Sequence, residues 1–292
     1  MGLAPPANLR KDNALSNYAH PEVLVSTQWV TDHLNDSNVR LIEVDTKTVR
    51  YESGHLPGAV CWTIYQDLLQ PDNKILDATS LETLLSQSGI SNHITVVVYG
   101  DSWNSQACMA FWVLRAHGHY NLYVMDGGRK KWLAEGRQTT TAKPTPTPTE
   151  YMVTTPDWSN RARRDFVLES IGKPDRVLVD VRNSKEYGGE FFWPAEPPQE
   201  GERAGHIPGA VHIPFEAAMN DDGMFKSVEE LRAVYEGKGV TADKEICTYC
   251  TVGGRSCHTW FVLKYLLGYR NVREYVDSWF EWGRLPDVPV EK

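Results

Sequence analysis

One six-residue stretch combines a cysteine, two glycines and an arginine in an order that suits nucleophilic chemistry. It follows an apolar run that predicts a strand, precedes an expected helix from Ser256, and reads Cys250-Thr251-Val252-Gly253-Gly254-Arg255. The backbone N–H groups of such a loop and the positive end of the next helix attract anions. Because these fields and a nearby cation favour the thiolate form, we predict that Cys250 is a nucleophile.

Other cysteine chemistries fit this stretch less well. Cys247 and Cys250 have a Cys-x-x-Cys spacing, as in redox enzymes and half zinc sites, but the sequence holds no second Cys-x-x-Cys or Cys-x-x-His to complete a metal site. Cys247 is also predicted to lie within a strand, whereas a redox Cys-x-x-Cys normally opens a helix. We therefore expect no metal. Cys257, seven residues after Cys250, is a candidate resolving or protective thiol.

The length of the loop argues against phosphate chemistry. Cysteine phosphatases have five residues between the cysteine and the arginine that binds the phosphoryl oxygens, and only four separate Cys250 from Arg255. The loop also contains no Asp or Glu that could protonate a leaving alkoxide. A smaller loop suits the terminal sulfur of a persulfide better than a tetrahedral phosphate.

The elements that must position this loop occur twice in the chain. Residues 54–60 (GHLPGAV) return 151 positions later as residues 205–211 (GHIPGAV), and Tyr99/Tyr249 and Trp132/Trp282 match at an offset of 150. Two copies of one domain follow from this repeat. The Pro/Thr-rich residues 137–150 predict an extended linker. We therefore divide the chain into an N-terminal extension, a first domain, a linker and a second domain, at 1–21, 22–136, 137–165 and 166–288.

Within each copy, short β-rich runs alternate with helical patterns. The predicted strands are 39–44, 94–99 and 122–125 in the first copy and 176–181, 245–249 and 272–275 in the second, and the clearest helix is 256–267. This alternation predicts an α/β fold in which each copy has a mostly parallel sheet with helices on both faces. Reactive groups gather at the C-terminal ends of parallel strands, which is the position of Cys250.

Composition restricts the partners. A net charge of −8 over 292 residues argues against nucleic acid as the main partner. No window approaches the roughly 20 apolar residues of a membrane span, so no membrane partner is expected. The polar N-terminus lacks the layout of a signal peptide, and five sparse cysteines do not form a disulfide framework, so we expect a reducing cytoplasm.

Four motifs together resemble the tandem-domain rhodanese family of sulfurtransferases: GHIPGA, Asp180-Val181-Arg182, CTVGGRS and the late SWFEWG. The resemblance implies a rhodanese fold repeated twice, one active site in the second copy, and a persulfide on Cys250 formed by double displacement. It implies an anionic donor such as thiosulfate or 3-mercaptopyruvate. The acceptor would be cyanide or a thiol, including that of a thioredoxin-like protein, and no cofactor would be needed.

The same resemblance assigns roles around the nucleophile. Arg182 and Arg255 would bind the anionic donor, with Asp180 as a supporting residue. The donor or the persulfide would also be bound by the rest of the loop, namely Thr251, Val252, Gly253, Gly254 and Ser256. The first copy has Gly100 opposite Cys250 and Asp45 opposite Arg182, so we predict that it is catalytically silent.

The choice of donor depends on three positions. Mercaptopyruvate enzymes of the family carry a carboxylate-binding arginine where this chain has Glu186-Tyr187, although Arg203 could replace it. Thiosulfate enzymes carry basic residues where this chain has Thr251 and Val252. We favour thiosulfate, keep 3-mercaptopyruvate as the alternative, and keep a non-enzymatic sulfur carrier or binding module as a further one.

Three further features bear on the site. Asp277 replaces the glycine of the family's DGSW turn, where we expect a left-handed backbone at some cost in energy and turnover. The aromatic run 191–193 lies in an insertion and predicts either a lid over the Cys250 cleft or a docking patch. His258 is most simply a packed helix residue, and the alternative is a proton donor to leaving sulfite.

Overall fold

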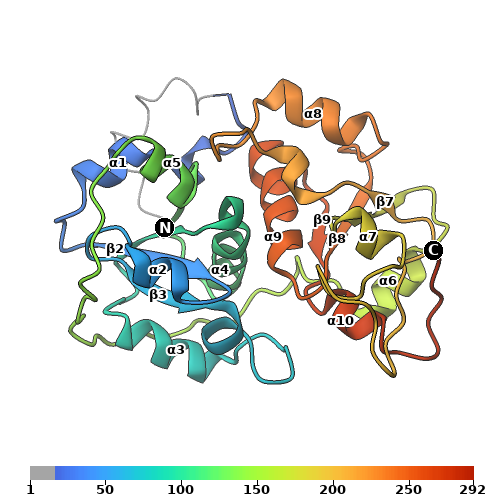
Figure 1. The fold of residues 1–292 in the computed structure, drawn as a ribbon, viewed down its shortest axis with the longest axis horizontal. Coiled ribbons are helices and arrows are strands. Elements are labelled where there is room, and N and C mark those ends of the chain that lie inside the picture. The colour runs from blue at the N-terminus through green and yellow to red at the C-terminus, as the bar shows by residue number, and fades with distance from the viewer. Residues whose placement is uncertain (1–16) are drawn as a thin grey trace. The chain divides into compact units, whose positions relative to one another are not determined.

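The structure, a computed structural model, describes residues 17–292 and divides into two compact units (Figure 1). Unit 1 contains the described residues up to Trp158 together with Asn220–Phe225, and unit 2 contains Ser159–Met219 and Lys226–Lys292. Residues 1–16 lie outside the described part. They include most of the predicted N-terminal extension and the segment from which we predicted that there is no export signal.

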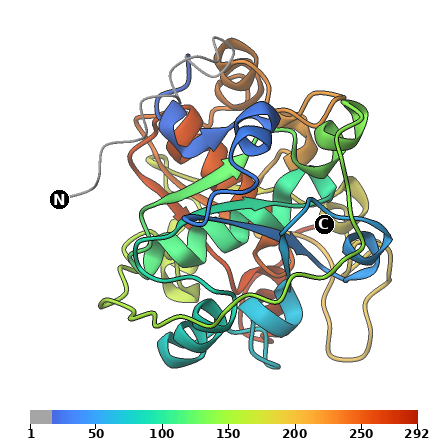
Figure 2. The ribbon, with the colours of Figure 1, turned by 90° about the vertical axis from the view of Figure 1, so that its left-hand side faces the viewer.

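Unit 1 is built on a five-stranded parallel sheet with the order β1-β5-β4-β2-β3. Its strands are β1 (Leu24–Val25), β2 (Val39–Asp45), β3 (Val60–Thr63), β4 (Thr95–Tyr99) and β5 (Leu122–Met125). Its helices are α1 (Thr27–Asp32), α2 (Val49–Ser53), α3 (Ala78–Gln87), α4 (Ser105–Ala116) and α5 (Gly128–Ala134), with short 3-10 or π turns at Pro21–Val23, Ile64–Leu68 and Ser102–Asn104. The almost wholly buried helix α4 packs against β2, β4 and β5 (Figure 2).

Unit 2 has a four-stranded parallel sheet with the order β7-β6-β8-β9. Its strands are β6 (Arg176–Asp180), β7 (Val211–His212), β8 (Glu245–Tyr249) and β9 (Val272–Glu274). Its helices are α6 (Arg164–Ser170), α7 (Ser184–Tyr187), α8 (Val228–Glu236), α9 (Gly254–Phe261) and α10 (Ser278–Trp282), with a 3-10 turn at Phe215–Ala218 and a π turn at Val262–Leu266. Helix α9 packs on β8 and β9, and the predicted fold of two parallel α/β sheets is confirmed.

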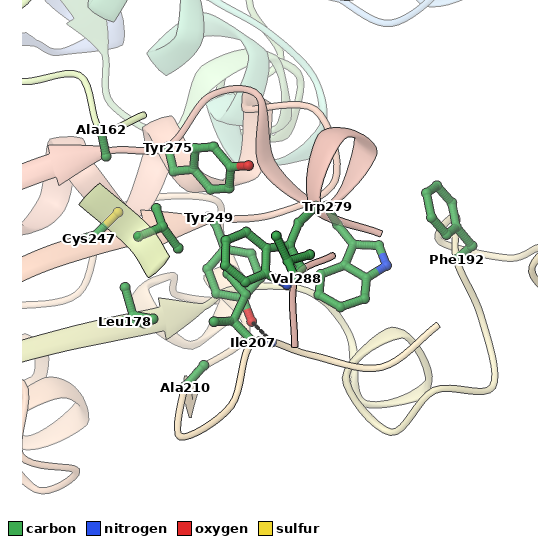
Figure 3. Close-up of a cluster of buried hydrophobic side chains, with 12 residues drawn as sticks. Ala162, Leu178, Phe192, Ile207, Ala210, Cys247, Tyr249, Tyr275, Trp279 and Val288 are labelled. Carbon is green, nitrogen blue, oxygen red and sulfur yellow. Dashed lines mark hydrogen bonds between the residues drawn. The ribbon is translucent and has the colours of Figure 1, made fainter. Parts of the chain in front are cut away.

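The repeated motif has a structural reason. In unit 2 the hydroxyl of Tyr249 accepts a hydrogen bond from the backbone N–H of Ile207, inside the core cluster of Figure 3. In unit 1 the hydroxyl of Tyr99 accepts one from Leu56 in the same way. The histidine of each turn is also packed, since His206 stacks on a tyrosine ring at 3.7 Å between centroids. Each tyrosine therefore fixes its GHxPGA turn over the end of the sheet.

Six strands were predicted within one or two residues of their observed ends, and three were missed. The missed strands, β1, β3 and β7, have only two to four residues each, too few for a periodic pattern. The helix expected over 256–267 begins two residues earlier and turns into a π-helical segment after Phe261.

Among residues 17–292, no helix combines the length and apolar character needed to cross a bilayer. Within residues 17–292, none of the five cysteines forms a disulfide bond. The cytoplasmic location stays a prediction.

Candidate active site

Cys250 lies directly after the buried strand β8, and its side chain is enclosed by the loop that follows. The residue is 1% exposed. Its Sγ accepts a hydrogen bond from the backbone N–H of Gly253 at 3.1 Å and lies 3.4 Å from the hydroxyl of Ser256. Helix α9 begins at Gly254, so its N-terminal end faces the same sulfur. The loop thus supplies hydrogen-bond donors to one thiol.

A glycine is required at position 253 for this geometry. Gly253 has φ +93°, which L-residues rarely adopt, and a Cβ there would lie 2.5 Å from Cγ2 of Val276. The tight turn directs the N–H of Gly253 back to the cysteine three residues earlier.

Helix α10 holds the loop from its other side. The backbone N–H of Cys250 donates to Oγ of Ser278 at 3.0 Å, and the N–H groups of Trp279 and Phe280 donate to the carbonyls of Cys250 and Thr251. Ser278 has φ +51°, a strained value for serine, so the backbone conformation that brings its hydroxyl to Cys250 has a cost in energy.

The expectation of a left-handed Asp277 is wrong. Its φ of −66° and ψ of −25° are right-handed helical values, and its carboxylate forms an ion pair with Arg161 at 2.9 Å. The left-handed conformation falls on Ser278 instead, one residue later in the turn.

Arg255 is part of a buried polar cluster at the outer side of the loop. Its guanidinium donates to both carboxylate oxygens of Glu186 at 2.7 and 2.8 Å and to Oγ1 of Thr251 at 2.8 Å. The Thr251 hydroxyl itself donates to Glu186. Burial alone would lower the pKa of Arg255, but its hydrogen bonds to Glu186 raise the pKa, so the cation is permanent. Glu186 is fully buried and neutralises it.

Arg182 is fully buried next to Asp180. Its guanidinium donates to both oxygens of Asp180, and to the carbonyl of Gly205 at 2.6 Å. It also lies 4.4 Å from the ring centre of Trp279. Because the side chain has no exposed surface, Arg182 in this conformation fixes the GHIPGA turn and offers no accessible cation to a donor. Its role in donor binding stays a prediction.

The structure brings three residues to the site that sequence reasoning missed. Glu186 and Ser278 are described above, and Glu274 on β9 lies beneath the loop, where its carboxyl contacts the hydroxyl of Ser256 at 2.5 Å. Of these three, only Glu186 belongs to a motif that the sequence could have revealed, because it forms a capping box with Asn183 at the start of α7.

The remaining loop residues lie where the sequence predicted, without showing what they bind. Gly254 is buried and Val252 is half-buried at the turn. Cys257 is buried in α9, and its N–H donates to the carbonyl of Gly253. His258 is buried against the sulfur of Met219 at 3.1 Å, and burial lowers its pKa to about 3. A neutral histidine does not donate a proton to sulfite as an imidazolium would.

The insertion is anchored through its aromatic residues and Arg203. Phe192 is fully buried in the core cluster, and Trp193 packs on Phe280 of α10 at 5.8 Å between ring centres. The guanidinium of Arg203 binds the carbonyls of Trp282, Leu285 and Val288. These contacts tie the insertion to the C-terminal segment.

The corresponding loop of unit 1 has different chemistry. Asn104 accepts a hydrogen bond from Gly100, and the backbone N–H of Asp101 donates to Asp45 at 2.9 Å. Burial raises the pKa of Asp45 to about 7. Ser102, Trp103 and Asn104 all have positive φ, so these three turn residues adopt left-handed conformations although none of them is a glycine.

Within residues 17–292, no group of three or more His, Cys, Asp and Glu side chains is placed to hold a metal ion.

Comparison with known proteins identifies the family. The sequence profile of the Rhodanese-like domain matches residues 26–135 and 164–285, one match for each copy. The chain belongs to the rhodanese family. Its relatives include the sulfur carrier protein TtuD of Thermus thermophilus, 50% identical over 94% of this chain and 98% of that protein. Another is a putative thiosulfate sulfurtransferase of Saccharopolyspora erythraea, 45% identical over 92% and 96%.

A solved structure shares the fold of this chain. The wild-type structure of EanB superimposes with a TM-score of 0.81 over 94% of this chain and 70% of that one. At 24% identity this likeness shows the fold alone.

Proposed function

We propose that this tandem rhodanese is a sulfurtransferase that carries sulfane sulfur as a persulfide on Cys250. The observation that carries the proposal is the placement of one thiol at the end of a central parallel strand, where the Gly253 N–H and the Ser256 hydroxyl reach its sulfur. A thiolate in that position is a nucleophile that needs no cofactor to accept or release a sulfur atom.

The reaction proceeds in two displacements. In the first, the Cys250 thiolate attacks the outer sulfur of thiosulfate, and the sulfur–sulfur bond of the donor breaks with its electron pair leaving on sulfite. In the second, cyanide or a thiolate attacks the outer sulfur of Cys250–S–S⁻, and Sγ leaves as the thiolate. Each step exchanges one bond at sulfur, so no external oxidant or proton is consumed.

Thiosulfate is the donor that the relatives favour, because several at 42–45% identity are named putative thiosulfate sulfurtransferases. 3-Mercaptopyruvate has less support. Its carboxylate would need a cation, and the Arg203 guanidinium already binds three backbone carbonyls.

A second candidate function is that of a sulfur carrier serving a partner protein. Both arginines near the loop are paired with buried carboxylates, Arg255 with Glu186 and Arg182 with Asp180, which weakens the attraction for a small dianion. A relative at 50% identity is named a sulfur carrier. A persulfide on a partner protein would deliver sulfur without requiring a strong anion site.

Steady-state turnover separates these functions. A thiosulfate sulfurtransferase forms thiocyanate from thiosulfate and cyanide with many turnovers, and Cys250→Ser abolishes it. A carrier takes up one sulfur per chain but turns over slowly with small donors, and faster with a protein persulfide. Turnover retained in Cys250→Ser would reject both functions.

A further inference from the structure

A chain of hydrogen bonds runs beneath the loop and ends at the sulfur of Cys250. Glu274 is fully buried, and its two oxygens lie 2.5 Å from the hydroxyls of Ser256 and Thr248. The Ser256 hydroxyl in turn lies 3.4 Å from Sγ of Cys250. Two hydroxyls and a carboxyl therefore connect strands β8 and β9 to the sulfur.

The fold itself does not require these polar groups. Thr248 and Glu274 are register partners in the β8–β9 pair of unit 2. At the equivalent positions of unit 1, 150 residues earlier, the β4–β5 pair has Val98 opposite Val124. The same sheet is thus built with an apolar pair in the copy that lacks the cysteine, and the polar pair accompanies the cysteine.

The surroundings of Glu274 favour its neutral form. Within residues 17–292 it has no ion pair, and a buried carboxylate without a cation is costly. Burial and the nearby Cys250 raise the pKa of Glu274 well above its usual range, against the two hydroxyls, which lower it.

The charged and titratable groups around this carboxyl supply no compensating charge. Cys247 on β8 and Cys250 in the loop are near the carboxyl, and a cysteine side chain carries no positive charge in either protonation state. Asp277 is paired with Arg161, and Arg273 next to Glu274 is paired with Glu245.

The number of hydrogens limits the directions in which these hydrogen bonds can run. Ser256 has one hydroxyl hydrogen and three neighbours that could receive it: Glu274, the carbonyl of Gly253 at 3.1 Å, and Sγ. If Glu274 is ionised, it takes this hydrogen. If Glu274 is neutral, its hydrogen goes either to Thr248, whose hydroxyl can then donate to the carbonyl of Ser256 or Arg273, or to Ser256. The second arrangement leaves the Ser256 hydrogen for the sulfur. A charged sulfur is a stronger acceptor than a neutral carbonyl.

We propose that Glu274 is a positioning residue that, as a neutral acid, donates to Ser256 and so directs the Ser256 hydroxyl to Sγ of Cys250. The inference rests on the proposed sulfur transfer. The hydroxyl contacts Sγ, the atom that regains the electron pair when an acceptor removes the outer sulfur. The relay therefore favours unloading of the persulfide more than loading, and no proton has to leave it.

Two variants test the relay. Glu274→Gln keeps a neutral side chain with an N–H donor for Ser256. The double variant Thr248→Val, Glu274→Val copies the apolar pair of unit 1 and removes the relay while leaving Ser256 in place.

Infrared spectroscopy and alkylation do not depend on activity. The wild-type minus Glu274→Gln difference spectrum at pH 7 should contain the carbonyl band of a protonated carboxyl. The pH profile of Cys250 alkylation by iodoacetamide should be unchanged in Glu274→Gln and shifted to higher pH by about one unit in the double variant. Single-turnover transfer of sulfur from the persulfide to cyanide should stay within about threefold in Glu274→Gln and fall about five- to tenfold in the double variant, as for loss of one hydrogen bond.

Other results of these measurements would overturn the inference. Absence of the carbonyl band, or an alkylation profile moved to lower pH in Glu274→Gln, would mean that Glu274 is a carboxylate and would overturn the inference. If wild-type protein fails to load sulfur, the proposed function is rejected, while the band and the profile still decide the state of Glu274. If the double variant does not fold, Glu274→Gln alone decides.

Discussion

Replacing Glu186 by glutamine should strengthen the reaction with thiosulfate. The Glu186 carboxylate is fully buried and cancels the charge of Arg255 at contact distance. At roughly 7 Å from a bound dianion and an effective dielectric constant of about 40, removing one negative charge is worth about 2 kcal/mol. Since about 1.4 kcal/mol corresponds to a factor of ten, kcat/KM for thiosulfate should rise about thirtyfold.

The assay measures kcat/KM with thiosulfate and cyanide at low and high ionic strength. The gain in Glu186→Gln should shrink as salt screens the unmasked Arg255. Glu216→Gln is the matched control, because Glu216 also faces Arg255 but is exposed, and its effect should stay below about twofold. A folded Glu186→Gln protein with unchanged or reduced kcat/KM would refute the argument that Glu186 masks the cation.

Three further changes have defined outcomes. Ser278→Ala removes the acceptor of the buried Cys250 N–H and should lower the free energy of unfolding in urea by about 1–2 kcal/mol. Ser278→Gly should lower it less, because glycine adopts the positive φ of this position without strain. Equal losses of stability in the two variants would contradict the inference that Ser278 is strained. Arg182→Met leaves the Asp180 carboxylate buried without its cation and should cost about 3–5 kcal/mol by the same assay; a fully stable variant with weaker thiosulfate binding would instead favour a direct donor site. Burial raises the pKa of Asp126 from 3.8 to about 7, so the native state keeps this proton to higher pH than the unfolded state does, and the free energy of unfolding falls as pH rises from about 4 to 7. Asp126→Asn should flatten this part of the plot of stability against pH. An unchanged slope in the variant would contradict the raised pKa.

The fold could be predicted because its signals are local and repeated. Residues 96–99 are an apolar run and residues 245–249 are a largely apolar one, and the GHxPGA turns recur at a spacing within one residue of that between Tyr99 and Tyr249. Strands β3 and β7 follow those turns but are too short to carry a pattern of their own. Their positions are set by pairing with β2 and β6.

The site was only partly readable. The Cys250 loop could be found because its residues are contiguous, whereas Glu186, Glu274 and Ser278 reach it from other elements. Arg182 looks like a free cation in the sequence, but Asp180, two residues earlier, folds back onto its guanidinium inside the core. Such pairings depend on tertiary packing, which no local pattern reports.

Peptide mass spectrometry after brief incubation with thiosulfate or, in parallel, 3-mercaptopyruvate tests the central proposal most directly. One sulfur atom should be added to the peptide that contains Cys250, should disappear after treatment with cyanide, and should be absent in Cys250→Ser. The buried thiols Cys108 and Cys257 serve as internal controls and should stay unmodified. Labelling by 3-mercaptopyruvate alone would reverse the choice of donor. Failure of both donors and of a protein persulfide to label Cys250 would contradict sulfur transfer through this residue.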